Sequence, residues 1–347
     1  MTKINHPEPK TLIAKLDPKT FGHWAYLATE KHFQKILKHE TEVLKDKDPE
    51  ELHQMRVGMR RLRTAVTGFA PALSLPNAAQ EKNIAKVARI LGELRDIDVL
   101  KDTLETQYLP TLPSQEQDIL KKVLATLKKQ RQKSLEQVQA TLNQQRYQEL
   151  KQAFQNWLNR PSYGEFAEFP IAEILPDLLL PSISQLFLHS AWLVGVKLDA
   201  GDIGVPSELN KEIVEQLLNV HGDTLHSLRK QAKRVRYQME LFTDFYGSTY
   251  KGYLKDIKEI QRVLGEIQDS VVLAAFLSET LGSGSAEQMP MLNAQLTQSR
   301  YQAWQEWRGL QQRYLSAAAR KDFHQTLLEP VLEPISEPTV LAAQRIV

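Results

Sequence analysis

The chain of 347 residues contains no cysteine. This excludes disulfide bonds, cysteine-ligated zinc, iron–sulfur clusters and thiolate nucleophiles, and it fits a reducing, cytoplasmic compartment. Glycine is scarce, with 15 residues, whereas Leu, Gln, Lys, Glu and Ala are abundant, a composition that favours helices. No segment shows sustained alternation of β-branched and polar residues, so we predict no β-strand.

Targeting and membrane signals are also lacking. The N-terminus has no apolar run of the kind that a secretory signal needs. The longest apolar stretch, residues 178–196, contains Pro181, Gln185, His189 and three serines. We therefore expect a buried helix of a large bundle there rather than a membrane span, and no association with membranes.

Catalytic signatures are missing as well. The sequence has no GxxxxGK[ST], no GxGxxG after a strand, no HExxH and no GxSxG. No local spacing suggests a nucleophile with its base. We therefore expect a protein that is not an enzyme and that needs no cofactor.

The clearest positive feature is an internal repeat. The segment His53-Gln-Met-Arg-Val-Gly-Met-Arg-Arg-Leu-Arg63 recurs as His226-Ser-Leu-Arg-Lys-Gln-Ala-Lys-Arg-Val-Arg236, at an offset of 173 residues. The segment that begins Leu91-Gly-Glu recurs as Leu264-Gly-Glu at the same offset, with six of ten residues identical. Two matches at one offset indicate a duplicated helical unit.

The repeat predicts an all-α fold of two tandem four-helix bundles. We place the first repeat at residues 20–160 and the second at 161–330, between a flexible N-terminal tail (1–19) and a C-terminal tail (331–347). The periodic stretches predict helices at 20–46, 49–75, 78–106, 115–144, 146–159, 171–198, 208–219, 222–246, 249–280, 288–317 and 320–328. Ser207 is the expected N-cap of the helix that follows the loop at 199–207.

Each repeat carries a basic stripe along one helix. His53, Arg56, Arg60 and Arg63 fall within an arc of about 80° on a helical wheel, and the second repeat matches them. Apolar residues run one position ahead, so each helix is expected to bury an apolar stripe beside the basic one. Together the windows 53–63 and 226–236 hold nine of the 44 Lys+Arg and none of the 42 Asp+Glu, which leaves 35 bases against 42 acids elsewhere. The near-neutral total therefore conceals a doubled basic site.

Such stripes need compensation, because like charges one turn apart repel each other. Acids on other helices are one source, with Asp96 and Asp269 the leading candidates for ion pairs. A bound anion is another, since arginine forms bidentate contacts with phosphate. A merely solvated basic face is the alternative for a single stripe, but two at matched register favour ligand binding. Gly92 and Gly265 fall within helices, which predicts close helix–helix approach.

The paired histidines and aspartates leave two further interpretations open. His53 and His226 either hydrogen-bond a neighbouring helix end or contact an anion that favours their protonated form. A metal site is less favoured, because Asp96 and Asp98 lie about 200° apart on a helix and cannot chelate together.

These motifs resemble the CHAD family, the conserved histidine α-helical domain. His-x-x-Arg-x-x-x-Arg/Lys-Arg-x-Arg followed by Leu-Gly-x-x-x-Asp carries the resemblance, which extends over residues 20–330. The second copy is the closer match, whereas the first has Thr64 where the second has Tyr237. The resemblance implies bundles related by a pseudo-two-fold axis, with a basic groove or pore between them.

The resemblance also implies binding of inorganic polyphosphate and association with polyphosphate granules. The matching positions are His53, Arg56, Arg60, Arg63, Lys82, Arg89, His226, Arg229, Lys233, Arg236, Lys255 and Arg262. Weaker candidates are Arg61, Lys230, Arg234, Arg131 and Arg300. Some members carry a triphosphatase domain with a Glu-x-Glu-x-Lys strand, which this sequence lacks, so we expect a stand-alone binding module.

Two other functions use the same residues. A metal-dependent phosphohydrolase would employ the paired histidines and aspartates. A binder of nucleic acid or of another polyanion would use the stripes. Tyr237 is the only aromatic residue that adjoins them, which disfavours base stacking and therefore nucleic acid as a partner.

Overall fold

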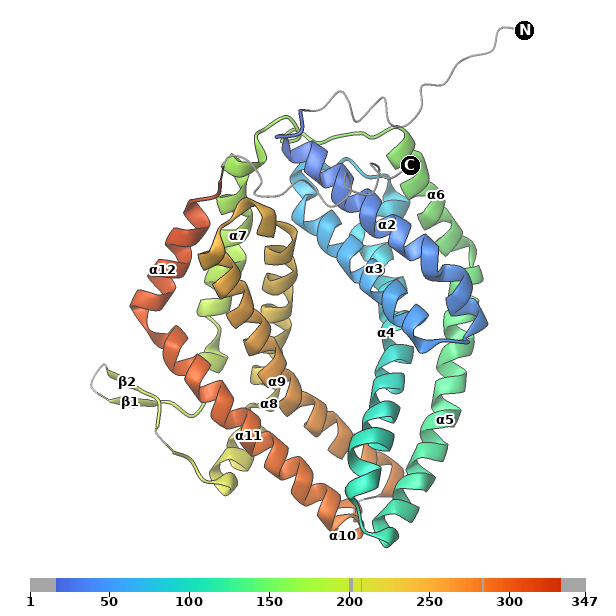
Figure 1. The fold of residues 1–347 in the computed structure, drawn as a ribbon, viewed down its shortest axis with the longest axis vertical. Coiled ribbons are helices and arrows are strands. Elements are labelled where there is room, and N and C mark those ends of the chain that lie inside the picture. The colour runs from blue at the N-terminus through green and yellow to red at the C-terminus, as the bar shows by residue number, and fades with distance from the viewer. Residues whose placement is uncertain (1–16, 200–201, 207, 283, 332–347) are drawn as a thin grey trace, which may run out of the picture. The chain divides into compact units, whose positions relative to one another are not determined.

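The computed structural model describes residues 17–199, 202–206, 208–282 and 284–331, and it is built almost wholly of α-helices (Figure 1). The predicted all-α fold class is confirmed. The prediction that the chain has no strand is wrong at one place, because β1 (Lys197–Asp199) and β2 (Asp202–Gly204) pair as a short antiparallel hairpin. Three paired residues on each strand were too few to produce a period-2 signal in the sequence.

The chain divides into two compact units. Of the described residues, unit 1 contains 17–98, 130–176 and 330–331, and unit 2 contains 99–129 and those between 177 and 329. Besides α7 (Ile171–Phe187), two helices pass from one unit into the other, α4 (Glu81–Thr103) and α5 (Ser114–Asn143). The predicted groove or pore concerns the relative placement of the two units and stays a prediction, as do the repeat boundaries.

The remaining helices each lie in one unit, apart from α7. Those of unit 1 are α2 (Phe21–Lys45), α3 (Pro49–Gly68) and α6 (Gln145–Asn159). The linking helix is α7 (Ile171–Phe187). Those of unit 2 are α8 (Lys211–Leu241), α9 (Ser248–Leu281), α10 (Ser285–Gln288), α11 (Pro290–Leu315) and α12 (Ala317–Leu328). Of the predicted tails, residues 1–16 and 332–347 lie outside the described part of the chain.

The helix that carries the second basic stripe is longer than predicted. The sequence suggested two helices, 208–219 and 222–246, but α8 runs without a break through Gly222. A glycine inside a helix costs only about 1 kcal/mol, which the long buried face of α8 outweighs. Asn210 caps the helix, because its side-chain Oδ1 accepts the N–H of Ile213 at 2.9 Å. The predicted cap, Ser207, lies outside the described residues.

The apolar helix α7 ends earlier than expected, at Phe187 rather than residue 198. A 3-10 turn, Ser190–Leu193, follows it and leads into the hairpin. The stretch Ile171–Leu193 is long and apolar enough to cross a membrane by length and composition, a test that core helices of soluble proteins also pass. Along α7, Leu175, Leu179 and Ile183 are fully buried, as a core helix requires.

Each unit has its own aromatic core. In unit 1 the rings of Phe33 and Phe154 pack with their centroids 5.4 Å apart. In unit 2 Trp192 stacks on Trp307 at 4.9 Å, and the buried Gln311 donates to the carbonyl oxygen of Trp192 at 2.7 Å. These cores leave the cations of the long helices at the surface of each unit.

Two predicted site residues cross-link their helices to other segments through carboxylates. Arg131 of α5 donates to both carboxylate oxygens of Asp46 at 2.7 Å and to Asp98 at 2.6 Å. Its hydrogen bonds to Asp46 raise the pKa of its guanidinium against the opposing effect of burial. Arg300 of α11, 8% exposed, holds Glu215 of α8 with two hydrogen bonds of 2.8 and 2.6 Å. Both arginines are thus saturated by carboxylates, which favours a structural role.

The tip of the α4–α5 connection belongs to unit 2 and caps one of its helices. The side chain of Glu116 is buried, and its two carboxylate oxygens accept the backbone N–H groups of Met291 and Leu292 at 2.9 and 3.0 Å. These are among the unpaired N–H groups at the start of α11. A carboxylate at this end also complements the helix dipole.

Removal of the Arg300 cross-link is expected to destabilise the fold. Arg300→Gln should lower the free energy of unfolding by about 3 kcal/mol, because Glu215 loses its bidentate partner inside unit 2. The matched control is Arg89→Gln: Arg89 is 73% exposed and lies 3.8 Å from Glu93, so the change should stay below about 0.5 kcal/mol. Urea unfolding followed by circular dichroism measures both. Equal effects of the two substitutions would contradict the structural role.

Candidate anion-binding surface

The two basic stripes lie on α3 and α8, beside residues that are buried. Asp48 caps α3 by accepting the N–H of Glu50 at 2.8 Å, and Pro49 occupies the first helical position. The predicted apolar stripes are confirmed, since all of their members are at most 7% exposed: Leu52, Met55, Met59, Leu62, Val66, Phe69, Leu225, Leu228, Ala232, Val235, Met239 and Phe242. Burial of these residues determines the direction in which the neighbouring cations point.

The predicted ion pairs with the two aspartates are confirmed. Arg56 contacts Asp96 of α4 at 3.2 Å, and Arg229 contacts Asp269 of α9 at 3.5 Å. Both aspartates are 72% exposed, whereas the arginines are only 24% and 25% exposed. The same contact therefore recurs in each unit at the repeat offset of 173, and each aspartate holds its arginine against the next helix.

The two helical glycines make room for these arginines. A Cβ atom at Gly92 would lie 3.6 Å from Nε of Arg56, and one at Gly265 would lie 3.2 Å from Nε of Arg229. The sequence predicted close packing of helices at these positions. The group that approaches each glycine is the guanidinium of an arginine rather than the backbone of a neighbouring helix, which only the tertiary structure could show.

In unit 2 the guanidinium of Arg229 is not fully paired. Nε of Arg229 is buried and has no hydrogen-bond partner among the described residues. The pair with Asp269 uses a different nitrogen of the same guanidinium. Because this Nε atom is buried, an anion at the surface can reach the guanidinium only through the exposed quarter of the side chain.

Both histidines of the motif are surrounded by cations. Burial lowers the pKa of His53, and Arg95, Arg60 and Arg56 lower it further, against an opposing effect of Glu50. Each histidine is therefore mostly uncharged at neutral pH in the unliganded protein.

His226 follows the same pattern in unit 2. Burial lowers its pKa first, then Lys230 and Arg229, whereas Asp223 and Asp269 raise it. Its Nδ1 atom is buried without a hydrogen-bond partner among the described residues. Of the two interpretations left open by the sequence, a helix-end hydrogen bond at Nδ1 of His226 is not seen in the described part of the chain.

The cations of the second helix differ between the units. In unit 1, Lys82 and Arg89 of α4 are exposed, and Arg63 of α3 pairs with Glu81. In unit 2, Arg262 of α9 is enclosed by three carboxylates, which belong to Glu259, Glu266 and Glu306. This cluster carries more negative than positive charge.

The end of the stripe on α8 is also partly neutralised. Arg236 pairs with Glu240 at 3.0 Å, and Lys258 reaches the same carboxylate at 3.4 Å. The guanidinium of Arg236 lies over the ring of Tyr237 at 5.2 Å. Lys255 of α9 is exposed and acts on Glu259, whose pKa is lowered chiefly by its hydrogen bond to Arg262. The basic surface of unit 1 is thus the less compensated of the two.

Several cations of unit 1 escaped the sequence analysis. Arg95 acts on His53, but its repeat counterpart is Gln268, so a search for repeated residues passes over it. Lys31, Lys35 and Lys38 lie on α2, which precedes the first matched segment. Their charge alone was the available signal.

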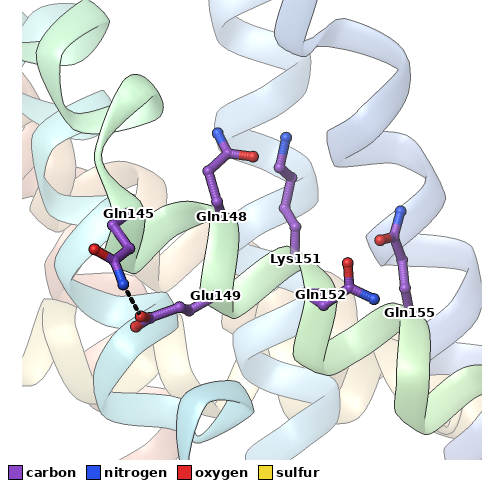
Figure 2. Close-up of a pocket in the computed structure, with 6 residues that line it drawn as sticks. All are labelled: Gln145, Gln148, Glu149, Lys151, Gln152 and Gln155. Atoms are coloured by element: carbon purple, nitrogen blue, oxygen red, sulfur yellow. Dashed lines mark hydrogen bonds between the residues drawn. The ribbon is translucent and has the colours of Figure 1, made fainter.

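The basic stripes do not line the depression found on α6. That hollow of about 360 Å³ is bordered by one polar helix face, shown in Figure 2: Gln145, Gln148, Glu149, Lys151, Gln152 and Gln155. Gln145 donates to Glu149 at 2.8 Å across it. In the described part of the chain, no three His, Asp or Glu side chains are grouped so as to hold a metal ion. The arrangement on α3 and α8 suits surface contact with an anion.

Comparisons with known proteins agree with this arrangement. The crystal structure of the CHAD domain from the plant Ricinus communis superposes with a TM-score of 0.55 and 24% sequence identity, over 90% of this chain and 93% of that one. PptA from Streptomyces chartreusis gives a TM-score of 0.58 and 14% identity, over 85% of this chain and 99% of that one. At these identities the likeness concerns the fold. A search of curated proteins found no match.

The family model of the CHAD domain matches residues 27–278, which is well over half of the chain and includes both basic stripes. The predicted resemblance is therefore confirmed: this chain belongs to the CHAD domain family, whose known roles relate to polyphosphate.

Proposed function

We propose that the protein binds inorganic polyphosphate through the basic stripes of α3 and α8 and does so without catalysis. The observation that carries the proposal is the repeated cradle, in which an arginine lies over a helical glycine and is held by an exposed aspartate. In each stripe the aspartate holds one arginine, and one further carboxylate, Glu81 or Glu240, pairs with another. A row of cations with this spacing suits an anion that has many closely spaced negative groups.

This surface is better suited to a ligand that is recognised by its charge than to one that is recognised by its bases. Tyr237, the aromatic residue next to the α8 stripe, is 8% exposed and is covered by Arg236. It therefore offers no open ring for base stacking, the main source of affinity for single-stranded nucleic acid. We extend the proposal to a cytoplasmic location on polyphosphate granules.

Reversal of one central charge in each stripe should abolish binding. For Arg60→Glu with Lys233→Glu we expect the affinity for long-chain polyphosphate to fall by about 100-fold or more at moderate salt, because two charge-assisted contacts become repulsive. Calorimetric titration measures the affinity, and circular dichroism verifies the fold.

The matched control makes the same change in net charge at other positions of each unit. Lys47→Glu with Lys321→Glu alters exposed lysines outside α3 and α8 and should shift affinity by no more than about threefold, by long-range electrostatics alone. The proposal is wrong if the wild type fails to bind polyphosphate, or if RNA displaces it at equal phosphate concentration. Release of orthophosphate with a divalent metal, lost in His53→Gln with His226→Gln, would instead establish the hydrolase.

The depressed pKa values of the histidines predict that binding depends on pH. In the free protein the pKa of each histidine lies below the ordinary value of 6.5, so both groups are mostly neutral at pH 6.5 and above. A bound polyanion favours the protonated form, so affinity should rise by about tenfold as the pH falls from about 7.5 to about 5.5, with proton uptake. Titrations in buffers of different ionisation enthalpy measure that uptake. His53→Gln with His226→Gln should abolish it, and an unchanged pH profile in this variant contradicts the role of the histidines.

A further inference from the structure

Unit 1 carries a second row of cations on α2. Lys31, Lys35 and Lys38 lie at positions i, i+4 and i+7, within an arc of about 60° on one helix face. Lys31 and Lys38 are exposed and Lys35 is partly exposed, whereas Phe33 and Ile36 on the opposite side are buried in the core. The row therefore faces solvent.

Close packing of α2 against α3 brings this row next to the first basic stripe. A Cβ atom at Gly58 of α3 would lie 3.0 Å from Cγ1 of Ile36 and 3.5 Å from the carbonyl oxygen of His32. Arg61 follows one turn later on the same side of α3. It lies about 160° around the helix from Arg63, so the two arginines border the solvent face of α3 at its α2 and α4 edges.

The charges on the α2 edge act on one another. Burial lowers the pKa of Lys35 first, Arg61 lowers it further, and Lys38 adds to the effect against Glu50. Burial, followed by Arg61, Lys31 and Lys35, lowers the pKa of His32 to about 3. The buried histidine therefore stays neutral and adds no charge of its own.

Apart from the attraction between Glu50 and Lys35, the described carboxylates leave this edge without compensation. In the part of the chain that the structure describes, none of the four cations forms an ion pair within 4 Å. The acids farther along α2 are used elsewhere, because Glu40 pairs with Lys151 at 2.7 Å and Glu42 pairs with Lys45 at 2.6 Å. Four like charges thus remain together at a cost that a bound anion would offset.

In unit 2 a lysine row of the same spacing, Lys251, Lys255 and Lys258, lies on α9 instead, where Lys258 pairs with Glu240 at 3.4 Å and Lys255 acts on Glu259. Arg234 of α8 is the counterpart of Arg61 at the repeat offset, and it contacts Gln231 at 3.5 Å. The helix packed there is α7, where Gln238 of α8 donates to the carbonyl oxygen of Leu178 at 2.6 Å. Residues 177–187 of α7 contain no lysine or arginine. Among the described residues, a lysine row beside this edge of the stripe helix is therefore found in unit 1 and has no counterpart on α7.

We propose that Lys31, Lys35 and Lys38, together with Arg61, form an accessory site for the same phosphate chain, which extends from the α3 stripe across the α2 edge. The inference rests on the proposed function and deepens it, because it assigns a preference for long chains to unit 1. Lysine ammonium groups are compact point charges that suit a flexible row of phosphates without demanding a fixed shape. A short oligophosphate fills the α3 stripe and leaves the α2 edge empty.

The test compares long-chain polyphosphate with tripolyphosphate on the full chain. Lys31→Gln/Lys35→Gln/Lys38→Gln should weaken long-chain binding about tenfold at low salt and reduce the salt slope of log K by about two, by analogy with counterion release from single strands. Its affinity for tripolyphosphate should stay within about twofold of the wild type. The control Lys47→Gln/Lys211→Gln/Lys321→Gln makes the same charge change and should bind long chains within about twofold of the wild type.

Lysine acylation with mass spectrometry supplies a second readout on the wild type. Long-chain polyphosphate should protect all three α2 lysines, and tripolyphosphate should leave them reactive. Wild-type long-chain affinity in the α2 variant, equal loss for both ligands, or absence of protection would each overturn the accessory site while leaving the proposed function intact. A wild type that binds polyphosphate of no length overturns both.

Discussion

Burial of an apolar stripe directly beside a basic one is the constraint on which the surface of this protein depends. On α3 the residues Met55, Met59 and Leu62 are buried in the core of unit 1. Helix geometry then directs the side chains next to them toward the neighbouring helix or solvent. The arginines therefore point outward as a row. The free energy released by burial of the apolar stripe exceeds the mutual repulsion of these arginines, so the helix forms despite it.

One contact converts this row from loose side chains into an ordered surface. Arg56 lies over Gly92 and is held by Asp96, and the same three positions recur as Arg229, Gly265 and Asp269. A Cβ atom would crowd the guanidinium at Gly265, whereas at Gly92 it would make an ordinary contact. The aspartates are exposed and keep water contact, so each pair orients an arginine without burying a charge. A preorganised donor loses little freedom when an anion arrives.

Similar sequences in the two repeats do not produce equal surfaces. Arg89 and Arg262 are counterparts, yet Arg89 is exposed and has a single distant carboxylate, whereas Arg262 is surrounded by Glu259, Glu266 and Glu306. One of these acids, Glu306, comes from another helix, α11. A repeat search aligns the arginines but cannot see which carboxylates fold against them. The charge available to a ligand is therefore a property of each unit and its packing.

The sequence alone determined the fold class, the positions of the basic stripes and the choice of Asp96 and Asp269 as ion-pair partners of those stripes, because helical periodicity and a repeat at one offset can be recognised without knowledge of the fold. Tertiary structure alone decided the rest. It placed Arg131 and Arg300 in carboxylate cross-links, brought Arg95 close enough to act on His53, and set α2 against α3 so that Arg61 acts on Lys35. These outcomes depend on contacts between segments far apart in the chain. Such contacts decide whether the charge of a side chain is compensated, and no local sequence pattern specifies them.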